Sequence, residues 1–197
     1  NILNRLSNLG LADNDTENKL TACREILFEA RSARERPGLD DKILADWNGL
    51  MIAALSFAGR IFGKADWLEA AENAFEFILK EMTNGPRLKH SYCAGEAKPV
   101  DMLDDYAGMI KAALGLYQAT GKPVYLEHAQ QWTETAASHF WDNDGAGYYL
   151  SPDDADDLIT RTRTAFDNAT PSGNGLMAEN LARLFYLTGD DTCRLKV

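Results

Sequence analysis

The most restrictive feature of this sequence is an internal repeat. Three segments match when they are aligned on an early glycine: "NGLMIAALSFAGRIFGKADWLEAA" from Asn48, "AGMIKAALGLYQATGKPVYLEHA" from Ala107 and "NGLMAENLARLFYLTGDDTCRLKV" from Asn174. Each copy has a second glycine 13 or 14 residues after the first, in the pairs Gly49 and Gly63, Gly108 and Gly121, Gly175 and Gly189. A glycine at the second place ends one helix and begins a turn, so the repeat predicts consecutive helical hairpins.

The two helices of each predicted hairpin differ in character. The first is apolar around much of its circumference and is typical of an inner helix, whereas the second carries a charged face and is typical of an outer helix. We expect inner helices over residues 42–62, 104–120 and 173–188. We expect outer helices over residues 65–82 and 123–140 and from 190 onward, with one further helix over 17–34. The pattern predicts an all-α single domain over 1–197, either an open solenoid or part of a closed α/α toroid.

Long inserts separate the hairpins. They read "NGPRLKHSYCAGEAKP" over 84–99 and "WDNDGAGYYLSPDDADDLITRTR" over 141–163. Their turn residues stand beside short β-type runs, among them "GYYL" and "LITRT", which predict small strand pairs. Because each insert joins an outer helix to the next inner helix, both lie at the end where the inner helices begin. We therefore expect the functional site at that end.

Alignment on the first glycine also brings polar and aromatic residues into register. Asp46, Asp105 and Ser172 stand three residues before it, and Trp47 and Tyr106 stand two before it in the first two copies. In a toroid these positions converge on one mouth, where helix N-termini supply free N–H groups and a positive dipole end. Such a mouth suits a small polyhydroxylated ligand or glycan. In the alternative interpretation these residues are only helix caps and first-turn residues, and Ser172 is a typical cap.

Composition excludes several classes of protein. A net charge of −10 repels phosphate backbones, so we expect no nucleic-acid partner. No apolar run reaches the ~18 residues of a membrane span, and the first residues lack the pattern of a signal peptide. Three scattered cysteines form no C-x-x-C pair, which fits a reducing, cytoplasmic compartment. The carboxylates form no ligand loop, and we expect neither a metal nor a cofactor.

Several motifs resemble those of one known family. "ARSARERPGLDDKILADWNGLMIAAL", "LDDYAGMIKAALGLYQATG", "FWDNDGAGYY" and "RTRTAFDNATPSGNGLMAENLARLFYLTGD" are similar, in this order, to the YyaL family, which includes the spermatogenesis-associated thioredoxin-domain-containing proteins. The resemblance covers essentially the whole chain. It implies an (α/α)6 toroid of the six-hairpin glycosidase class, of which these residues form about half the ring. It also implies a thioredoxin-like domain elsewhere in the protein, absent here. Gly38 and Asn168 depart from the family pattern, which commonly has His and Gly there.

Three functional hypotheses follow. The first is an enzyme of carbohydrate metabolism, similar to a glycoside hydrolase, with Asp105 as general acid or base and Asp167 as its partner. Its expected substrate-binding residues are Asp41, Asp46, Trp47, Asn48, Tyr106, Arg161, Arg163, Ser172 and Asn174. A sugar epimerase is disfavoured, because such chemistry calls for histidine at the mouth, whereas His90 lies in an insert and His128 and His139 on an outer helix.

The second hypothesis is a non-catalytic module that binds a glycan or peptide for the thioredoxin-like domain. The third is a purely structural toroid. The half ring also predicts apolar surface at both of its ends, so we expect a fragment of residues 1–197 to associate with itself or to be poorly stable.

Overall fold

The computed structural model describes residues 10–155 and 158–196, and it divides into two compact units, residues 1–40 and 41–197. The first unit contains α1 (Asn14–Ser32). Asp13 sets its start, because the carboxylate accepts a hydrogen bond from the backbone N–H of Thr16 at 2.9 Å. The helix predicted over 17–34 is thus confirmed, with its start displaced by this cap. None of the residues of α1 is buried.

The second unit consists of the predicted hairpins. The first pairs α2 (Ala45–Phe62) with α3 (Ala65–Glu81), the second α4 (Leu103–Thr120) with α5 (Pro123–His139), and the third α6 (Gly173–Thr188) with α7 (Asp191–Arg194). The inner helices end at Gly63, Gly121 and Gly189, whose φ angles of 63°, 71° and 74° lie in the left-handed region that glycine adopts readily. The repeat therefore predicted the hairpins correctly. The last outer helix is shorter than expected, with four residues.

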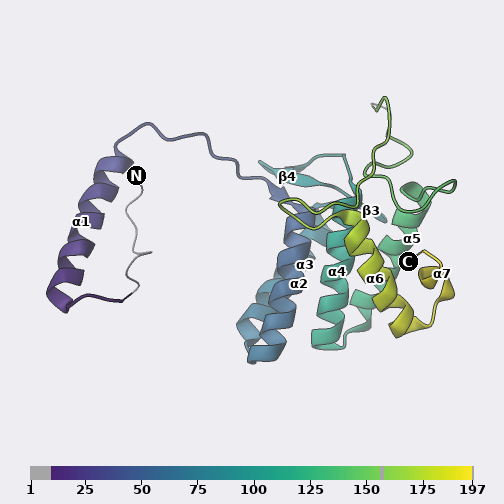
Figure 1. The fold of residues 1–197 in the computed structure, drawn as a ribbon, viewed down its shortest axis with the longest axis horizontal. Coiled ribbons are helices and arrows are strands. Elements are labelled where there is room, and N and C mark those ends of the chain that lie inside the picture. Colours follow the sequence, from purple (N-terminus) through teal and green to yellow (C-terminus); the bar gives the residue numbers. More distant parts are fainter. Residues whose placement is uncertain (1–9, 156–157, 197) are drawn as a thin grey trace. The chain divides into compact units, whose positions relative to one another are not determined.

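The inner helices pack side by side, and their starts lie at one end of this unit (Figure 1). The contact between α2 and α4 is a backbone contact. A Cβ atom added at Gly49 would overlap the carbonyl group of Gly108, and one added at Gly108 would lie 2.8 Å from the backbone oxygen of Asp46. α4 lies between the other two inner helices and is buried along most of its length. The repeated glycines therefore permit a separation between α2 and α4 that larger residues would prevent.

Short strands occur in the first insert. β2 (Thr83–Asn84) pairs with β3 (Arg87–Leu88), and β4 (Ser91–Cys93) lies between β5 (Glu96–Ala97) and β1 (Ile43–Leu44). β1 precedes α2 directly, which is why α2 begins at Ala45 rather than at the predicted residue 42. The strand pair predicted from "GYYL" and "LITRT" is wrong for the described residues of the second insert, where Tyr148 forms only an isolated bridge with Trp141.

Apolar side chains are exposed on the two inner helices that flank α4. On α2, Met51, Phe57 and Ile61 are each more than half exposed, and on α6 Tyr186 is 85% exposed. This agrees with the apolar surface predicted for the ends of a half ring. That the fragment associates with itself stays a prediction. That residues 1–197 form a single domain also stays a prediction. In the described part of the chain, none of the helices is both long and apolar enough to cross a membrane.

Candidate functional site at the inner-helix N-termini

The starts of α2, α4 and α6 come together as the repeat predicted. Gly108 of α4 lies against the backbone of Asp46, and a Cβ atom on Gly173 of α6 would overlap the carboxylate of Asp104. Around this junction lie Asp46, His90, Asp104 and Asp105, which we call the mouth cluster. Three carboxyl groups and one imidazole thus occupy the end where the inner helices present their N-termini.

Asp105 is the innermost member of the mouth cluster. Its side chain is 0% exposed, one carboxylate oxygen lies 2.9 Å from Nδ1 of His90, and the other accepts the backbone N–H of Met102 at 2.9 Å. Burial raises the pKa of Asp105 to about 6, although the hydrogen bond to His90 opposes this rise. A ligand cannot touch a carboxylate with no exposed surface, so in this structure Asp105 acts on the mouth only through His90.

His90 reaches the mouth because the first insert folds back onto α2. Its backbone N–H donates to the carbonyl of Val100 at 2.7 Å, and its own carbonyl accepts the N–H of Ala45 at 2.9 Å. The hydrogen bond to Asp105 is the main cause that raises the pKa of the imidazole, and the charges of Asp105, Asp46 and Asp104 add to it. The side chain is 27% exposed. The expectation that histidine is absent from the mouth is therefore wrong, and with it the reason for disfavouring an epimerase.

Asp46 and Asp104 are the half-buried carboxylates of the mouth cluster. Burial raises the pKa of Asp104, and the negative charge of Asp46 raises it further, while the backbone N–H of Gly173 opposes the rise. Asp46 accepts a hydrogen bond from the backbone N–H of Trp47 at 2.8 Å. The Trp47 side chain is 57% exposed, which leaves much of its indole accessible. These two carboxylates and this aromatic ring can reach a bound molecule.

Cation binding is geometrically compatible with part of the mouth cluster. A carboxylate oxygen of Asp46, a ring nitrogen of His90 and a carboxylate oxygen of Asp105 lie within 4.8 Å of one another, and a second such group comprises His139, Asp153 and Asp154. The hydrogen bond between His90 and Asp105 already accounts for the close approach of two of the three members of the first group. We therefore interpret these two residues as a hydrogen-bonded ion pair, with Asp46 beside it.

Tyr106, which the repeat predicted as a stacking wall, is fully buried instead. Its hydroxyl donates to Asp101 at 2.7 Å and accepts the backbone N–H of Leu88 at 3.2 Å. Arg87 forms ion pairs with both Asp101 and Asp154. The reason for the error is rotational: a buried inner helix turns adjacent residues to different sides, and Tyr106 faces the core.

Three predicted binding residues, Arg161 and Arg163 of the second insert and Asn174 of α6, form hydrogen bonds mainly with backbone groups. Arg161 donates to the carbonyls of His139 and Ser151, and Asn174 bonds both the N–H and the carbonyl of Tyr148 as well as the carbonyl of Thr164. Arg163 donates to Asp142 and to the carbonyl of Ala146. These contacts hold loops together, and the ligand-binding role predicted for these side chains stays a prediction.

The remaining predicted residues are distributed around the helix starts. Ser172 caps α6 by accepting the N–H of Gly175 at 3.1 Å, as predicted. The carboxylate of Asp167 accepts the N–H of Ser172 at 2.9 Å, and Asn48 donates to the carbonyl of Leu44 at 2.8 Å. Asp41 accepts a hydrogen bond from Cys93. The catalytic partnership of Asp105 with Asp167 stays a prediction, since the contact that the structure gives Asp167 is with the backbone of Ser172.

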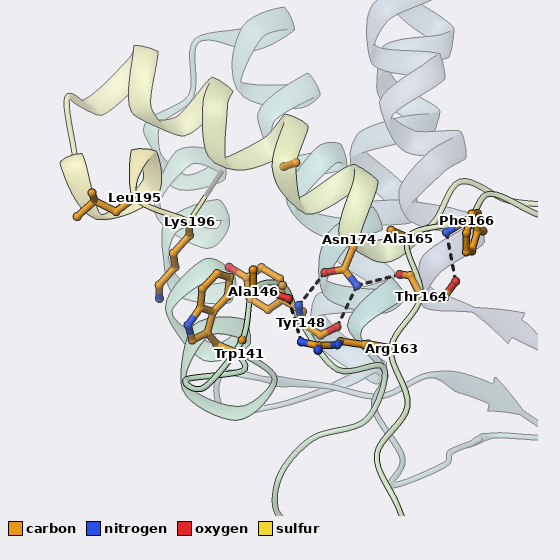
Figure 2. A pocket seen from close by; sticks show the side chains of 13 residues that line it. Trp141, Ala146, Tyr148, Arg163, Thr164, Ala165, Phe166, Asn174, Leu195 and Lys196 are labelled. Carbon is orange, nitrogen blue, oxygen red and sulfur yellow. Dashed lines mark hydrogen bonds between the residues drawn. The ribbon is translucent and has the colours of Figure 1, made fainter.

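A pocket of about 770 Å³ lies beside the start of α6. Figure 2 shows its lining side chains, with Asn174 and Arg163 on one side and Trp141 and Lys196 on the other. It brings together two predicted binding residues, Arg163 and Asn174. None of the residues of the mouth cluster lines it.

The fold and the mouth cluster define the chain as part of an α/α toroid of helical hairpins. Cellobiose 2-epimerase from Bacillus thermoamylovorans matches with a TM-score of 0.65 and 14% identity, over 79% of this chain and 42% of that chain. The family 76 mannosidase Bt3792 of Bacteroides thetaiotaomicron matches with a TM-score of 0.63 and 14% identity, over 82% and 44%. At such identities the likeness shows the fold alone.

Relatives in sequence confirm the family resemblance. No family model matches the chain, but it is 36% identical over 176 residues to spermatogenesis-associated protein 20 of Rattus norvegicus, covering 84% of this chain and 22% of that protein. The human protein is 34% identical over the same length. An uncharacterized Caenorhabditis elegans protein is 32% identical over 181 residues, 88% of this chain and 25% of that protein. The chain is thus homologous to a segment of these spermatogenesis-associated proteins and spans less than a quarter of the mammalian ones.

Proposed function

We propose that this half toroid supplies a carbohydrate-active site of glycoside-hydrolase type, with the sugar bound over the mouth cluster. The observation that carries the proposal is the convergence of three helix starts on the partly exposed carboxylates Asp46 and Asp104. Glycoside cleavage requires a proton donor together with a carboxylate that acts as base or nucleophile. The exposed ring of Trp47 beside Asp46 adds an apolar face for the sugar.

The structural neighbours support the choice of ligand class. The epimerase and the mannosidase act on sugars by their names, and an α-1,6-mannanase of Salegentibacter, with a TM-score of 0.60 and 14% identity over 92% of this chain and 51% of that chain, is described in complex with α-1,6-mannotriose. That protein is an inactive variant in which two consecutive aspartates are replaced by asparagine. In the present chain, the consecutive residues Asp104 and Asp105 lie in the first turn of α4.

The test uses the full-length protein with α-1,6-mannotriose, cellobiose and a panel of 4-nitrophenyl glycosides. We expect release of reducing sugar or nitrophenol by the wild type, and a fall in kcat of about 100-fold or more in Asp46→Asn and Asp104→Asn. Glu69→Gln, on the exposed face of the outer helix α3, is the matched control and should keep full activity. Sugar-dependent shifts of the melting temperature without turnover would instead favour the non-catalytic binding module, and neither shift nor turnover would favour the structural toroid.

One observation favours a second candidate, sugar epimerisation. His90 stands in the mouth cluster, and an imidazole is the side chain most suited to remove a proton near neutral pH. Incubation of cellobiose with the protein in D2O separates the two reactions. Epimerisation predicts deuterium at C2 of the reducing sugar without cleavage, whereas hydrolysis predicts cleavage without deuterium at carbon.

A further inference from the structure

We infer that His90 is the proton donor of the mouth and that the buried Asp105 positions it. The inference rests on the proposed function, because the acceptor of the proton is the oxygen of a glycosidic bond. The imidazole is fixed from two directions. Its Nδ1 lies 2.9 Å from Asp105, whose second oxygen is held by the N–H of Met102, and its backbone is held by Val100 and Ala45.

This anchoring leaves one ring nitrogen for a ligand. With Nδ1 bonded to Asp105, Nε2 has no hydrogen-bond partner in the described part of the chain, and the side chain is 27% exposed. An imidazole held at one nitrogen by a buried carboxylate presents its other nitrogen in a fixed direction, as a carboxylate does for the histidine of a hydrolytic triad. Asp105 has no exposed surface of its own, so it takes part only as a positioning residue.

The charges around His90 favour its protonated form. Asp46 acts on it from α2, and Asp104 and Asp105 act on it from α4. All three are carboxyl groups, and their combined effect raises the pKa of His90. The surrounding carboxyl groups therefore favour the imidazolium, which is the form of His90 that can donate a proton.

The step that we assign to His90 is the following. Nε2–H transfers its proton to the glycosidic oxygen while the bond between that oxygen and the anomeric carbon breaks, and the electron pair of this bond stays with the departing oxygen. Water adds to the anomeric carbon, and Asp46 or Asp104 accepts the proton that the water loses. The neutral imidazole and the protonated carboxyl then exchange protons with solvent, which restores the starting state.

Dependence on the leaving group tests this assignment, because a departing group that needs no protonation no longer needs the donor. In the full-length protein we expect His90→Gln to lower kcat about 100-fold for a methyl glycoside but less than about tenfold for the 2,4-dinitrophenyl glycoside of the same sugar. Asp105→Asn should show the same selectivity to a smaller degree, and sugar affinity should stay unchanged in both. His139→Gln is the matched control, since His139 forms the same type of contact with Asp153 at 2.9 Å outside the mouth cluster.

Three outcomes would overturn the assignment of His90 as proton donor. Equal losses on both glycosides in His90→Gln would overturn the assignment, and so would leaving-group selectivity in Asp104→Asn instead, because Asp104 would then be the donor. If the wild type cleaves no glycoside, the proposed function fails and the donor role falls with it. NMR titration of His90 then tests the pair separately: its pKa should lie above the ordinary value of a histidine side chain and should fall in Asp105→Asn.

Discussion

The starts of α2 and α6 occupy equivalent places in the repeat, yet they are held by different means. At α2 the backbone does the holding: Ala45 donates to the carbonyl of His90, and Gly49 lies against Gly108. At α6 side chains do it, since Ser172 caps the helix and Asn174 binds the backbone on both sides of the pocket. At the start of α2, where backbone contacts hold the helix, Asp46 is half-buried and the Trp47 ring is exposed, so both stay accessible to a ligand. At the start of α6 the side chains of Ser172 and Asn174 are already hydrogen-bonded to backbone groups.

The largest effect should come from the backbone contact at α2. In Gly49→Ala the added Cβ would overlap the carbonyl of Gly108, and backbone cannot yield as a side chain can. We expect the free energy of unfolding to fall by about 3 kcal/mol. Urea denaturation measures this change. Gly175→Ala, at the equivalent place in α6, is the control. Its Cβ would approach only the hydroxyl of Ser172, at 3.0 Å, and we expect a change below about 1 kcal/mol.

Asn174→Ala tests how much the side-chain hydrogen bonds at the start of α6 stabilise the fold. The substitution removes three hydrogen bonds to backbone groups of Tyr148 and Thr164, and we expect a loss of about 2 kcal/mol in unfolding free energy. Asn168→Ala, in the exposed loop that precedes α6, is the control and should cost less than about 0.5 kcal/mol. If Asn174→Ala instead left stability intact and abolished sugar binding, the interpretation of this residue as a structural tie would be wrong.

The buried acid at the start of α4 predicts a dependence on pH. Because burial raises the pKa of Asp105 to about 6, the folded protein holds this proton more tightly than the unfolded chain, whose Asp has a pKa near 4. The stability that this group contributes therefore declines as pH rises from about 4 to 6.

The raised pKa of His90 acts in the same direction, and its contribution is complete below about pH 6.5 and lost as pH rises through the folded pKa. We expect Asp105→Asn to lose this dependence, so that its unfolding free energy relative to wild type increases by about 1 to 2 kcal/mol from pH 4.5 to 8. Calorimetry across this range measures it. A constant difference would contradict the raised pKa of Asp105 in the folded protein.

The smallest effect should come from the cap of α6. Ser172→Ala removes the acceptor for the N–H of Gly175 and should lower the unfolding free energy by about 1 kcal/mol. Ser172→Asp, which keeps an acceptor at the cap, is the matched control and should recover most of the loss. Equal losses in both variants would indicate that packing of the buried Ser172, rather than its hydrogen bond, holds this start.

The sequence predicted the hairpins well because the repeat and its closing glycines are local signals. It predicted the junction of the inner-helix starts for the same reason. The sequence did not predict His90 at the mouth. The pairing of β4 with β1 brings this residue to α2, and no local sequence pattern predicts so short a strand pair. The sequence also selected Asp105 over Asp104. Adjacent residues on a helix point about 100° apart, so an alignment alone does not tell which of two aspartates is buried.

The hydrogen bond from Ala45 to the carbonyl of His90 gives the mouth a reporter in the backbone. The amide hydrogen of Ala45 exchanges with solvent only when the first insert lifts away from α2, and the same opening withdraws the imidazole of His90 from Asp105. Exchange at this one amide therefore measures how often the mouth comes apart. A sugar that engages the imidazole should slow the exchange at Ala45 without touching Ala45 itself.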